Sequence, residues 1–351
     1  MRIVRARTLA AAVVVGGLAV APLAAMMNLP GEPAVKRLVG INPDGCIVRN
    51  TGDGDDWRDE PEMPTLRDGP SAAVVGSSVY LVGGIASFDR SYNVARSVAT
   101  FERFDTATGK WETLPPLPRA LNHVALAAVG DAIYALGGET DRLRLGDVVA
   151  ESWRYDIAAR RWDPIAPMPT ARGAAATAVL GHRIYVVGGL AGRASLETVE
   201  SYDVDTDRWR REPPMSTRRN HLATAALDGL VYALGGRAED EESVQTFERY
   251  DPRTGRWTRL ADVPEPKAGF ALLAVPGGLV AAGGENLRHW TLYGGVFRYD
   301  PATGRWSALP SMSDPRHGFG GAVVGDRLYV LGGSKCSGFF PSRESSSMRL
   351  P

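Results

Sequence analysis

Two markers recur along the chain in the same register. A Gly-Gly doublet occurs six times, beginning at Gly83, Gly137, Gly188, Gly235, Gly283 and Gly332. A tryptophan also recurs, at Trp57, Trp111, Trp162, Trp209, Trp257 and Trp306. Successive doublets and successive tryptophans are separated by the same five intervals, 54, 51, 47, 48 and 49 residues. A period near 50 residues predicts structural repeats that stack against one another and bury one continuous core.

Each repeat has the pattern of four strands. A first strand of alternating small and apolar residues is followed by a turn and by a second strand that ends at the doublet. After a loop of variable length, a third strand ends in an aspartate. A turn, which reads Asp-Pro-Arg-Thr-Gly in one repeat and Asp-Pro-Ala-Thr-Gly in another, then leads into the tryptophan, which opens the fourth strand. The aspartates stand six residues before their tryptophans and are Asp105, Asp156, Asp203, Asp251 and Asp300.

The doublet, the aromatic-Asp pair and the tryptophan together resemble kelch repeats over residues 45–335. The resemblance implies an all-β fold, a six-bladed β-propeller with four antiparallel strands in each blade. The recurring tryptophan, tyrosine and glycine positions are therefore assigned to packing between blades.

The last repeat predicts a first strand at about 319–324 and a second at about 327–333, and residues 337–351 are interpreted as a C-terminal tail. The N-terminal segment is expected to complete this blade with a third strand at Cys46–Arg49 and a fourth opened by Trp57, which would remove the exposed edges of an open ring. Cys46 and Cys336 are the two cysteines of the chain. We predict a disulfide between them that replaces the missing loop of the closing blade.

The N-terminus predicts export. Arg2, Arg5 and Arg7 precede an uncharged run from Thr8 to Gly31. A basic segment before an apolar one is typical of a signal peptide, and the run is also long enough to cross a bilayer. Residues 1–27 are thus a signal peptide or a membrane anchor (attachment through 8–29), and 28–44 are a linker to the propeller at 45–336. Both alternatives place the propeller outside the cytoplasm: periplasmic, secreted or anchored facing outward.

Cations recur at the predicted mouth of the central channel. Sixteen residues before each doublet, five of six repeats have a basic residue: Arg67, Arg172, Arg219, Lys267 and Arg316. Polar residues stand beside this position, namely Asn122, His123, Asn220, His221 and His317. Arginine binds carboxylate and phosphate groups bidentately, so we expect an anionic small molecule, glycan or protein as the partner. The alternative is that these arginines bond to backbone carbonyls of the scaffold.

The charge balance excludes one class of partner. Lys+Arg and Asp+Glu are 40 each, so the formal net charge is zero. A nucleic-acid binder usually carries a basic surface, and none is predicted here.

A binding module is favoured over an enzyme, but one enzymatic alternative stays open. Glu285 follows a doublet directly, and Arg288 lies close by. This pattern resembles exported kelch-type sialic acid epimerases (mutarotases), which implies a catalytic Glu285 and an Arg288 that holds a sugar acid. Copper-radical oxidases built on kelch propellers use a cysteine-linked tyrosine, and both cysteines here stand at the ring ends. No cofactor or metal is therefore expected.

Overall fold

The computed structural model describes residues 45–49, 52, 56–89, 94–141, 147–238 and 242–351. The predicted signal or anchor at 1–27 and the linker at 28–44 lie outside the described residues. Within the described ranges of the chain, no helix has the length and apolar character needed to cross a bilayer.

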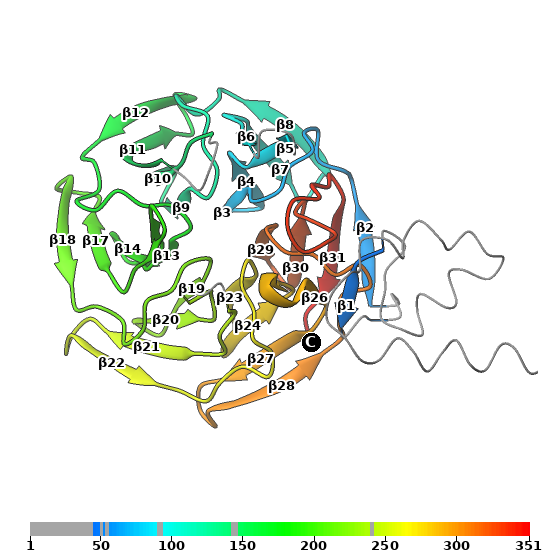
Figure 1. Ribbon diagram of the computed structural model, residues 1–351. Coiled ribbons are helices and arrows are strands. Elements are labelled where there is room, and N and C mark those ends of the chain that lie inside the picture. The colour runs from blue at the N-terminus through cyan, green and yellow to red at the C-terminus, as the bar shows by residue number, and fades with distance from the viewer. Residues whose placement is uncertain (1–44, 50–51, 53–55, 90–93, 142–146, 239–241) are drawn as a thin grey trace, which may run out of the picture. The chain divides into compact units, whose positions relative to one another are not determined.

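The described residues form six four-stranded antiparallel sheets arranged as blades around a ring (Figure 1). Blade 1 contains β3 (Ser71–Val75), β4 (Ser78–Val82), β7 (Phe101–Asp105) and β8 (Lys110–Leu114). Blade 2 contains β9 (Ala125–Val129), β10 (Ala132–Glu139), β11 (Val148–Asp156) and β12 (Arg161–Ile165). Blade 3 contains β13 (Ala176–Leu180), β14 (Arg183–Val187), β17 (Val199–Asp203) and β18 (Arg208–Glu212).

The other three blades complete the ring. Blade 4 contains β19 (Ala223–Leu227), β20 (Leu230–Leu234), β21 (Phe247–Asp251) and β22 (Arg256–Arg259). Blade 5 contains β23 (Ala271–Val275), β24 (Gly278–Ala282), β27 (Val296–Asp300) and β28 (Arg305–Leu309). Blade 6 contains β29 (Gly320–Val324), β30 (Arg327–Leu331), β31 (Ser345–Arg349) and β2 (Trp57–Glu60). The first strand of each blade contacts the first strands of both neighbouring blades, and β29 contacts β3, so the ring is closed. The predicted β-propeller of four-stranded antiparallel sheets is confirmed.

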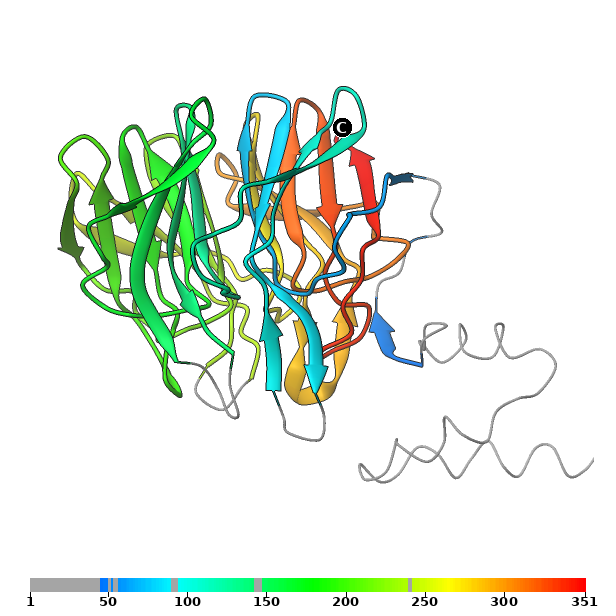
Figure 2. The same cartoon turned by 90° about the horizontal axis from the view of Figure 1, so that it is seen from above.

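Smaller elements follow the second strands. They are the pairs β5 (Ile85–Asp89) with β6 (Val94–Ser97), β15 (Leu190–Ala191) with β16 (Ala194–Ser195), and β25 (Glu285–Asn286) with β26 (Thr291–Tyr293). The 3₁₀ turn Leu287–His289 joins β25 to β26. Seen from the side, the β5–β6 and β25–β26 pairs, coloured cyan and gold, lie on the same face of the ring (Figure 2).

The recurring tryptophans pack against, or donate a hydrogen bond to, the preceding blade. Trp162 of blade 2 packs its ring against Phe101 of blade 1, with ring centroids 5.0 Å apart. Its indole N–H donates to the carbonyl of Pro115, just after blade 1 ends. The same indole bond to the preceding blade is made by Trp111, Trp209, Trp257 and Trp306. The assignment of these tryptophans to packing between blades is confirmed.

The second glycine of every doublet makes a bond between blades. Its N–H donates to a backbone carbonyl of the next blade, 2.9–3.0 Å away. The acceptor is the residue sixteen positions before the doublet of that blade, which we call the cation position. The six pairs are Gly84 with Leu121, Gly138 with Arg172, Gly189 with Arg219, Gly236 with Lys267, Gly284 with Arg316, and Gly333 with Arg67. A Cβ at Gly236 would lie 2.7 Å from the carbonyl oxygen of Asn220, at a φ of +99°. This close approach of backbones is what requires glycine.

We predict that Gly236→Ala lowers the free energy of unfolding by about 3 kcal/mol, because a left-handed φ and a steric overlap act together. Gly229 is the matched control, since it also has a positive φ (+76°) but nothing within 4 Å of the added Cβ. Gly229→Ala should therefore lose only about 1 kcal/mol. Denaturant unfolding of both variants measures the difference, and equal losses would contradict the packing argument.

The prediction that each end of the chain supplies two strands to the closing blade was wrong. The third strand of this blade is β31, which pairs with β30 and β2 and belongs to the segment interpreted as a C-terminal tail. Blade 6 therefore takes three strands from the C-terminal end of the chain and a single strand from the N-terminal end. The predicted third strand instead forms β1 (Ile47–Arg49), which pairs in parallel with β26. The sequence of β31, Ser-Ser-Ser-Met-Arg, lacks the aromatic-Asp pair that marks the other third strands.

The predicted disulfide is confirmed, but for a different reason. Cys46 and Cys336 are bonded, with their Cα atoms 5.3 Å apart. Because residues 332–344 already join the second strand of blade 6 to its third, the bond replaces no loop. It attaches the segment that contains β1 to the loop between β30 and β31.

Candidate functional site

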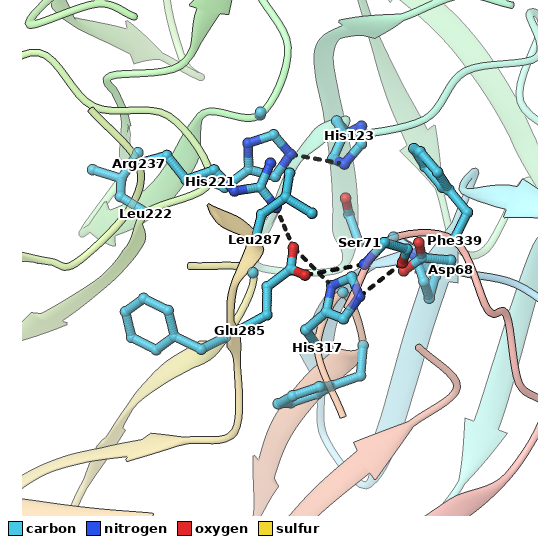
Figure 3. Close-up of a pocket in the computed structure, with 18 of the residues that line it drawn as sticks. Asp68, Ser71, His123, His221, Leu222, Arg237, Glu285, Leu287, His317 and Phe339 are labelled. Carbon is cyan, nitrogen blue, oxygen red and sulfur yellow. Dashed lines mark hydrogen bonds and ion pairs between the residues drawn. The ribbon is translucent and has the colours of Figure 1, made fainter. Parts of the chain in front are cut away.

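A cavity of about 200 Å³ lies on the ring axis and is lined by residues from all six blades. Its ionisable lining residues are Asp68, His123, His221, Arg237, Glu285 and His317 (Figure 3). The structure therefore brings the three predicted histidines and Glu285 together. Asp68 and Arg237 were not predicted.

The cavity is shaped by one position in each blade, two residues after the cation position. The occupants are Gly69, His123, Ala174, His221, Gly269 and Gly318, and all six have φ between +48° and +64°. Backbone bonds join neighbours around the axis, as where Ala174 N–H donates to His123 O and His221 N–H to Ala174 O. At the three glycines an added Cβ would lie within 4 Å of the side chain of Asp68, His123 or His317, whereas two imidazoles project from the ring at His123 and His221. Non-glycine residues in this conformation are strained, which is common at functional sites.

His123 and His221 face each other with their Nε2 atoms 3.1 Å apart. Each Nδ1 is hydrogen-bonded to the side-chain oxygen of the preceding asparagine, Asn122 or Asn220. The amide nitrogens of these asparagines donate in turn to Ser97 Oγ and Ser195 Oγ, both at 2.7 Å. This network assigns the ring proton to Nδ1 and leaves a lone pair on each Nε2.

The two imidazole rings meet at an angle rather than end to end. Their centroids are 4.6 Å apart and the rings are inclined by 75°. Two facing lone pairs repel unless a hydrogen lies between or in front of them. The His123–His221 pair is therefore satisfied by a shared proton or by an O–H donor, from water or from a ligand, in front of the two Nε2 atoms.

Glu285 is fully buried and held by four groups. Oε1 is paired with Arg237 and lies 3.4 Å from His317 Nδ1, while Oε2 accepts from Ser337 Oγ at 2.6 Å and from Gly338 N–H at 3.2 Å. Burial by itself raises the pKa of Glu285. His317, Arg237 and the hydrogen bonds from Ser337 and Gly338 outweigh burial and bring the pKa below its ordinary value. Glu285 is therefore a carboxylate at neutral pH.

Asp68 and His221 have pKa values displaced in opposite directions. Burial raises the pKa of Asp68, against the opposing effect of His317 and His123. Burial, with Arg237 and His123, brings the pKa of His221 well below 6.5. One cavity thus contains a carboxyl group that holds its proton more tightly than usual and a neutral imidazole. Such a pair is suited to proton transfer.

We predict that Asp68→Asn stabilises the protein at pH 7. A raised pKa in the folded state means that Asp68 favours folding below about pH 3.8 and that this contribution is lost as pH rises through the folded-state pKa. Above about pH 3.8 the ionisation of Asp68 costs more free energy in the folded protein than in the unfolded chain, so it opposes folding at pH 7, and the amide removes this cost. The melting temperature should rise by about 2–4 °C at pH 7, on the order of 1 kcal/mol, and the gain should vanish near pH 3. A gain that persists at pH 3 would contradict this account.

The five predicted cations do not line the cavity, and this prediction was wrong. Arg67, Arg172, Arg219, Lys267 and Arg316 are at most 1% exposed. Arg219 shows why: it donates to the carbonyls of Gly235 and Thr246 within its own blade, and Nη2 is 2.7 Å from Glu248 Oε2. The alternative interpretation, arginines that bond to scaffold carbonyls, is therefore correct.

The residue at one position of the third strand differs from blade to blade together with the residue at the cation position. The third-strand position faces the residue two before the doublet and is occupied by Glu102, Trp153, Glu200, Glu248, Phe297 and Ser346. Three arginines pair with the glutamates, while Leu121, which replaces the cation in blade 2, belongs to the same apolar cluster as Trp153. Lys267 lies 5.1 Å from the ring centroid of Phe297. Three of the five cations thus form buried ion pairs within their own blade, and Arg316 donates to Ser346 Oγ, which are structural roles.

Arg288 does not line the cavity. Its side chain is 53% exposed and lies 3.6 Å from Glu242. By contrast, Arg237 lines the cavity and follows its doublet directly, at the position that Glu285 occupies one blade later. The shared position directly after a doublet would have identified Arg237 from the sequence. Ser337 lies in a segment interpreted as a tail, and no sequence pattern pointed to it. Among the described residues, no three or more His, Cys, Asp or Glu side chains are grouped so as to hold a metal ion.

Comparison with known proteins supports the repeat assignment. A family model described as the KLHDC2/KLHL20/DRC7 Kelch-repeats domain matches residues 122–333, and the Kelch motif matches residues 66–118. The chain is similar to Kelch-like protein terF of Aspergillus terreus, with 34% identity over 38% of this chain and 30% of that protein. It is also similar to human Kelch domain-containing protein 8B, with 31% identity over 38% of this chain and 39% of that protein. The match thus spans about a third of the length of these curated relatives.

A solved structure supports the fold. The structure of YjhT superposes with a TM-score of 0.69 and 16% identity, over 82% of this chain and 95% of that one. At this identity the likeness concerns the fold alone. The chain belongs to the kelch-repeat family.

Proposed function

We propose that this kelch propeller is an extracytoplasmic binding module that holds a small, hydroxyl-rich ligand, such as a monosaccharide or sugar acid, in its axial cavity. The observation that carries the proposal is the His123–His221 pair, which presents two hydrogen-bond acceptors to a cavity that Asp68 and Glu285 also line. The proposed location rests on the basic and then apolar N-terminus and on the disulfide, which is typical of oxidising compartments.

The size and lining of the cavity favour a sugar. Its volume of about 200 Å³ is below the roughly 300–1,000 Å³ of sites for drug-sized ligands, so the ligand is small. Phe270, Phe319 and Phe339 contribute apolar surface to the same cavity. Apolar surface beside convergent acceptors suits a molecule with both C–H faces and hydroxyl groups.

A purely anionic ligand has less support than the sequence suggested. The five predicted cations are buried, and Arg237 of the cavity is already paired with Glu285. An acid group would require the histidine pair in its proton-sharing form. A neutral sugar needs only the acceptors that are present.

A thermal-shift screen with neutral monosaccharides and sugar acids tests the proposal. We expect saturable stabilisation by at least one sugar, and His123→Ala should weaken its affinity at least 10-fold because one acceptor of the pair is lost. His182→Ala is the control, since His182 is an exposed histidine paired with Asp205 and its loss should leave the affinity unchanged. No stabilisation by any sugar would reject the proposed ligand class.

The second candidate function is a cofactor-independent sugar mutarotase. The raised pKa of Asp68 and the lowered pKa of His221 favour this candidate. Opening of the sugar ring requires that one proton is removed from the anomeric hydroxyl and that another is delivered to the ring oxygen. His221 Nε2 would accept the first and Asp68 would donate the second, and ring closure would reverse both transfers. NMR measurement of anomer exchange decides: acceleration that is lost in Asp68→Asn and in Glu285→Gln supports the enzyme, and spontaneous rates with a bound sugar support the binding module.

A further inference from the structure

Cys336 of the disulfide is the first residue of a short segment, residues 336–338, that contacts both Glu285 and His317. The carbonyls of Cys336 and Gly338 accept from His317 Nε2 at 3.0 and 2.9 Å. Ser337 Oγ and Gly338 N–H donate to Glu285 Oε2. Residues 336–338 therefore orient one imidazole and one carboxylate of the cavity, and Gly338 itself lines the cavity.

The other half of the disulfide is joined to the strand that carries Glu285. Cys46 directly precedes β1, and Ile47 pairs with Thr291 of β26. β26 pairs in turn with β25, where Leu292 is opposite Glu285. The disulfide thus links the sheet that carries the Glu285 backbone to the loop that holds the Glu285 carboxylate. The two attachments together fix the carboxylate relative to its donors.

Backbone pairing holds only the base of this loop. Ser334 forms isolated bridges with His317 and Pro341, and Ser342 N–H donates to Gly333 O at 2.7 Å. Residues 336–338 lie beyond that base, where Cys336 is only 3% exposed. Breaking the disulfide removes the covalent constraint on this tip and increases its conformational entropy. The bonds to Glu285 and His317 then depend on the noncovalent contacts of a released loop.

We propose that the Cys46–Cys336 disulfide positions the ligand cavity, so that the protein binds its ligand tightly only while this bond is intact. The affinity measurement rests on the proposed binding function, whereas local hydrogen exchange tests the positioning role without a ligand. Reduction by a dithiol transfers two electrons and two protons to the bond and gives two cysteine thiols and the cyclic disulfide of the reagent. The closed ring of blades remains, because β31 is joined to β30 by backbone and pairs with β2.

The test compares oxidised protein, protein reduced by dithiothreitol and the Cys46→Ser/Cys336→Ser variant. Each form is assayed with the monosaccharide that stabilises the oxidised protein most in the thermal-shift screen. We expect the dissociation constant to rise at least 10-fold in the reduced protein and in the double variant, and dithiothreitol to have no further effect on the double variant. Amide exchange should accelerate at 336–340 and 285–293 but not in β19 and β20 of blade 4.

Ser337→Ala provides a test in which the disulfide is kept. It removes one donor to Glu285 and should weaken binding about 10-fold. Ser307→Ala is the control, because Ser307 is exposed on β28 and should leave binding unchanged. Equal affinity and equal exchange in the oxidised and reduced forms would overturn the proposal, as would faster exchange throughout all six blades. If no sugar binds the oxidised protein, the proposed function fails, and the exchange measurement alone decides the positioning role.

Discussion

Arg219→Ala is expected to lower the free energy of unfolding by about 3–5 kcal/mol, because it leaves the buried carboxylate of Glu248 without its partner. Both side chains of the pair are at most 2% exposed, and Arg219 also satisfies the carbonyls of Gly235 and Thr246. Burial lowers the pKa of Arg219 to about 10, and Glu248 opposes this shift. The guanidinium therefore remains charged at neutral pH. Denaturant unfolding at pH 7 measures the loss.

Two further variants separate charge from packing. Arg219→Leu/Glu248→Leu removes both charges, as blade 2 does with Leu121 and Trp153, and should recover much of the stability lost in the single variant. Arg253→Ala removes a surface arginine that is 85% exposed and paired with Asp251, and should change stability by less than about 1 kcal/mol. A double variant no more stable than Arg219→Ala would show that the carbonyl bonds, and not the unpaired glutamate, dominate.

Acidification should unfold the protein more readily through His221. Its pKa in the folded state is well below the ordinary value of 6.5, first because of burial and then because of Arg237 and His123. Between the two pKa values the unfolded chain binds more protons than the folded protein, so stability falls as pH decreases below about 6.5. The loss is about 1.4 kcal/mol for each pH unit until the folded-state pKa is reached. The difference between the unfolding free energies of the parent protein and of His221→Asn, measured from pH 7.5 to 4.5, should show this slope.

His221→Asn should flatten that dependence. Asparagine does not titrate and tolerates the left-handed backbone conformation at this position better than most residues. His182→Asn is the control and should leave the slope intact, since His182 is an exposed histidine. If His221→Asn and the parent protein lose stability in parallel below pH 6.5, another group is responsible for the acid sensitivity.

The sequence by itself determined the repeating architecture. The doublets and tryptophans are local signals with a direct physical cause: a Cβ at Gly236 would overlap a neighbouring backbone, and Trp162 spans from one blade to the next. The second glycines of all six doublets repeat the first contact and five of the six tryptophans repeat the second, so the markers recur in one register. The disulfide could also be predicted, since the chain has two cysteines and an N-terminus that predicts export.

Tertiary structure decided which side chains face the cavity. A basic residue at the start of a first strand can turn toward the axis or into its own blade, and periodicity does not distinguish these directions. Arg67 and Arg219 turn inward because Glu102 and Glu248 stand on the third strand, more than 25 positions later in the chain. Arg67 and Asp68 form isolated bridges to different segments, Ser342 and Ile85, and only Asp68 lines the cavity.

The closing of the ring was likewise decided by long-range pairing. β31 has no aromatic-Asp signal and is a strand because β30 and β2 supply hydrogen-bonding edges on both of its sides. Cys46–Arg49 matches the register of a third strand, yet it pairs with β26 because β31 already occupies the place between β30 and β2. Ser337 reaches Glu285 only through this arrangement. A residue whose role depends on contacts made 52 positions away leaves no local pattern in the sequence, because its position is set by the closed ring as a whole.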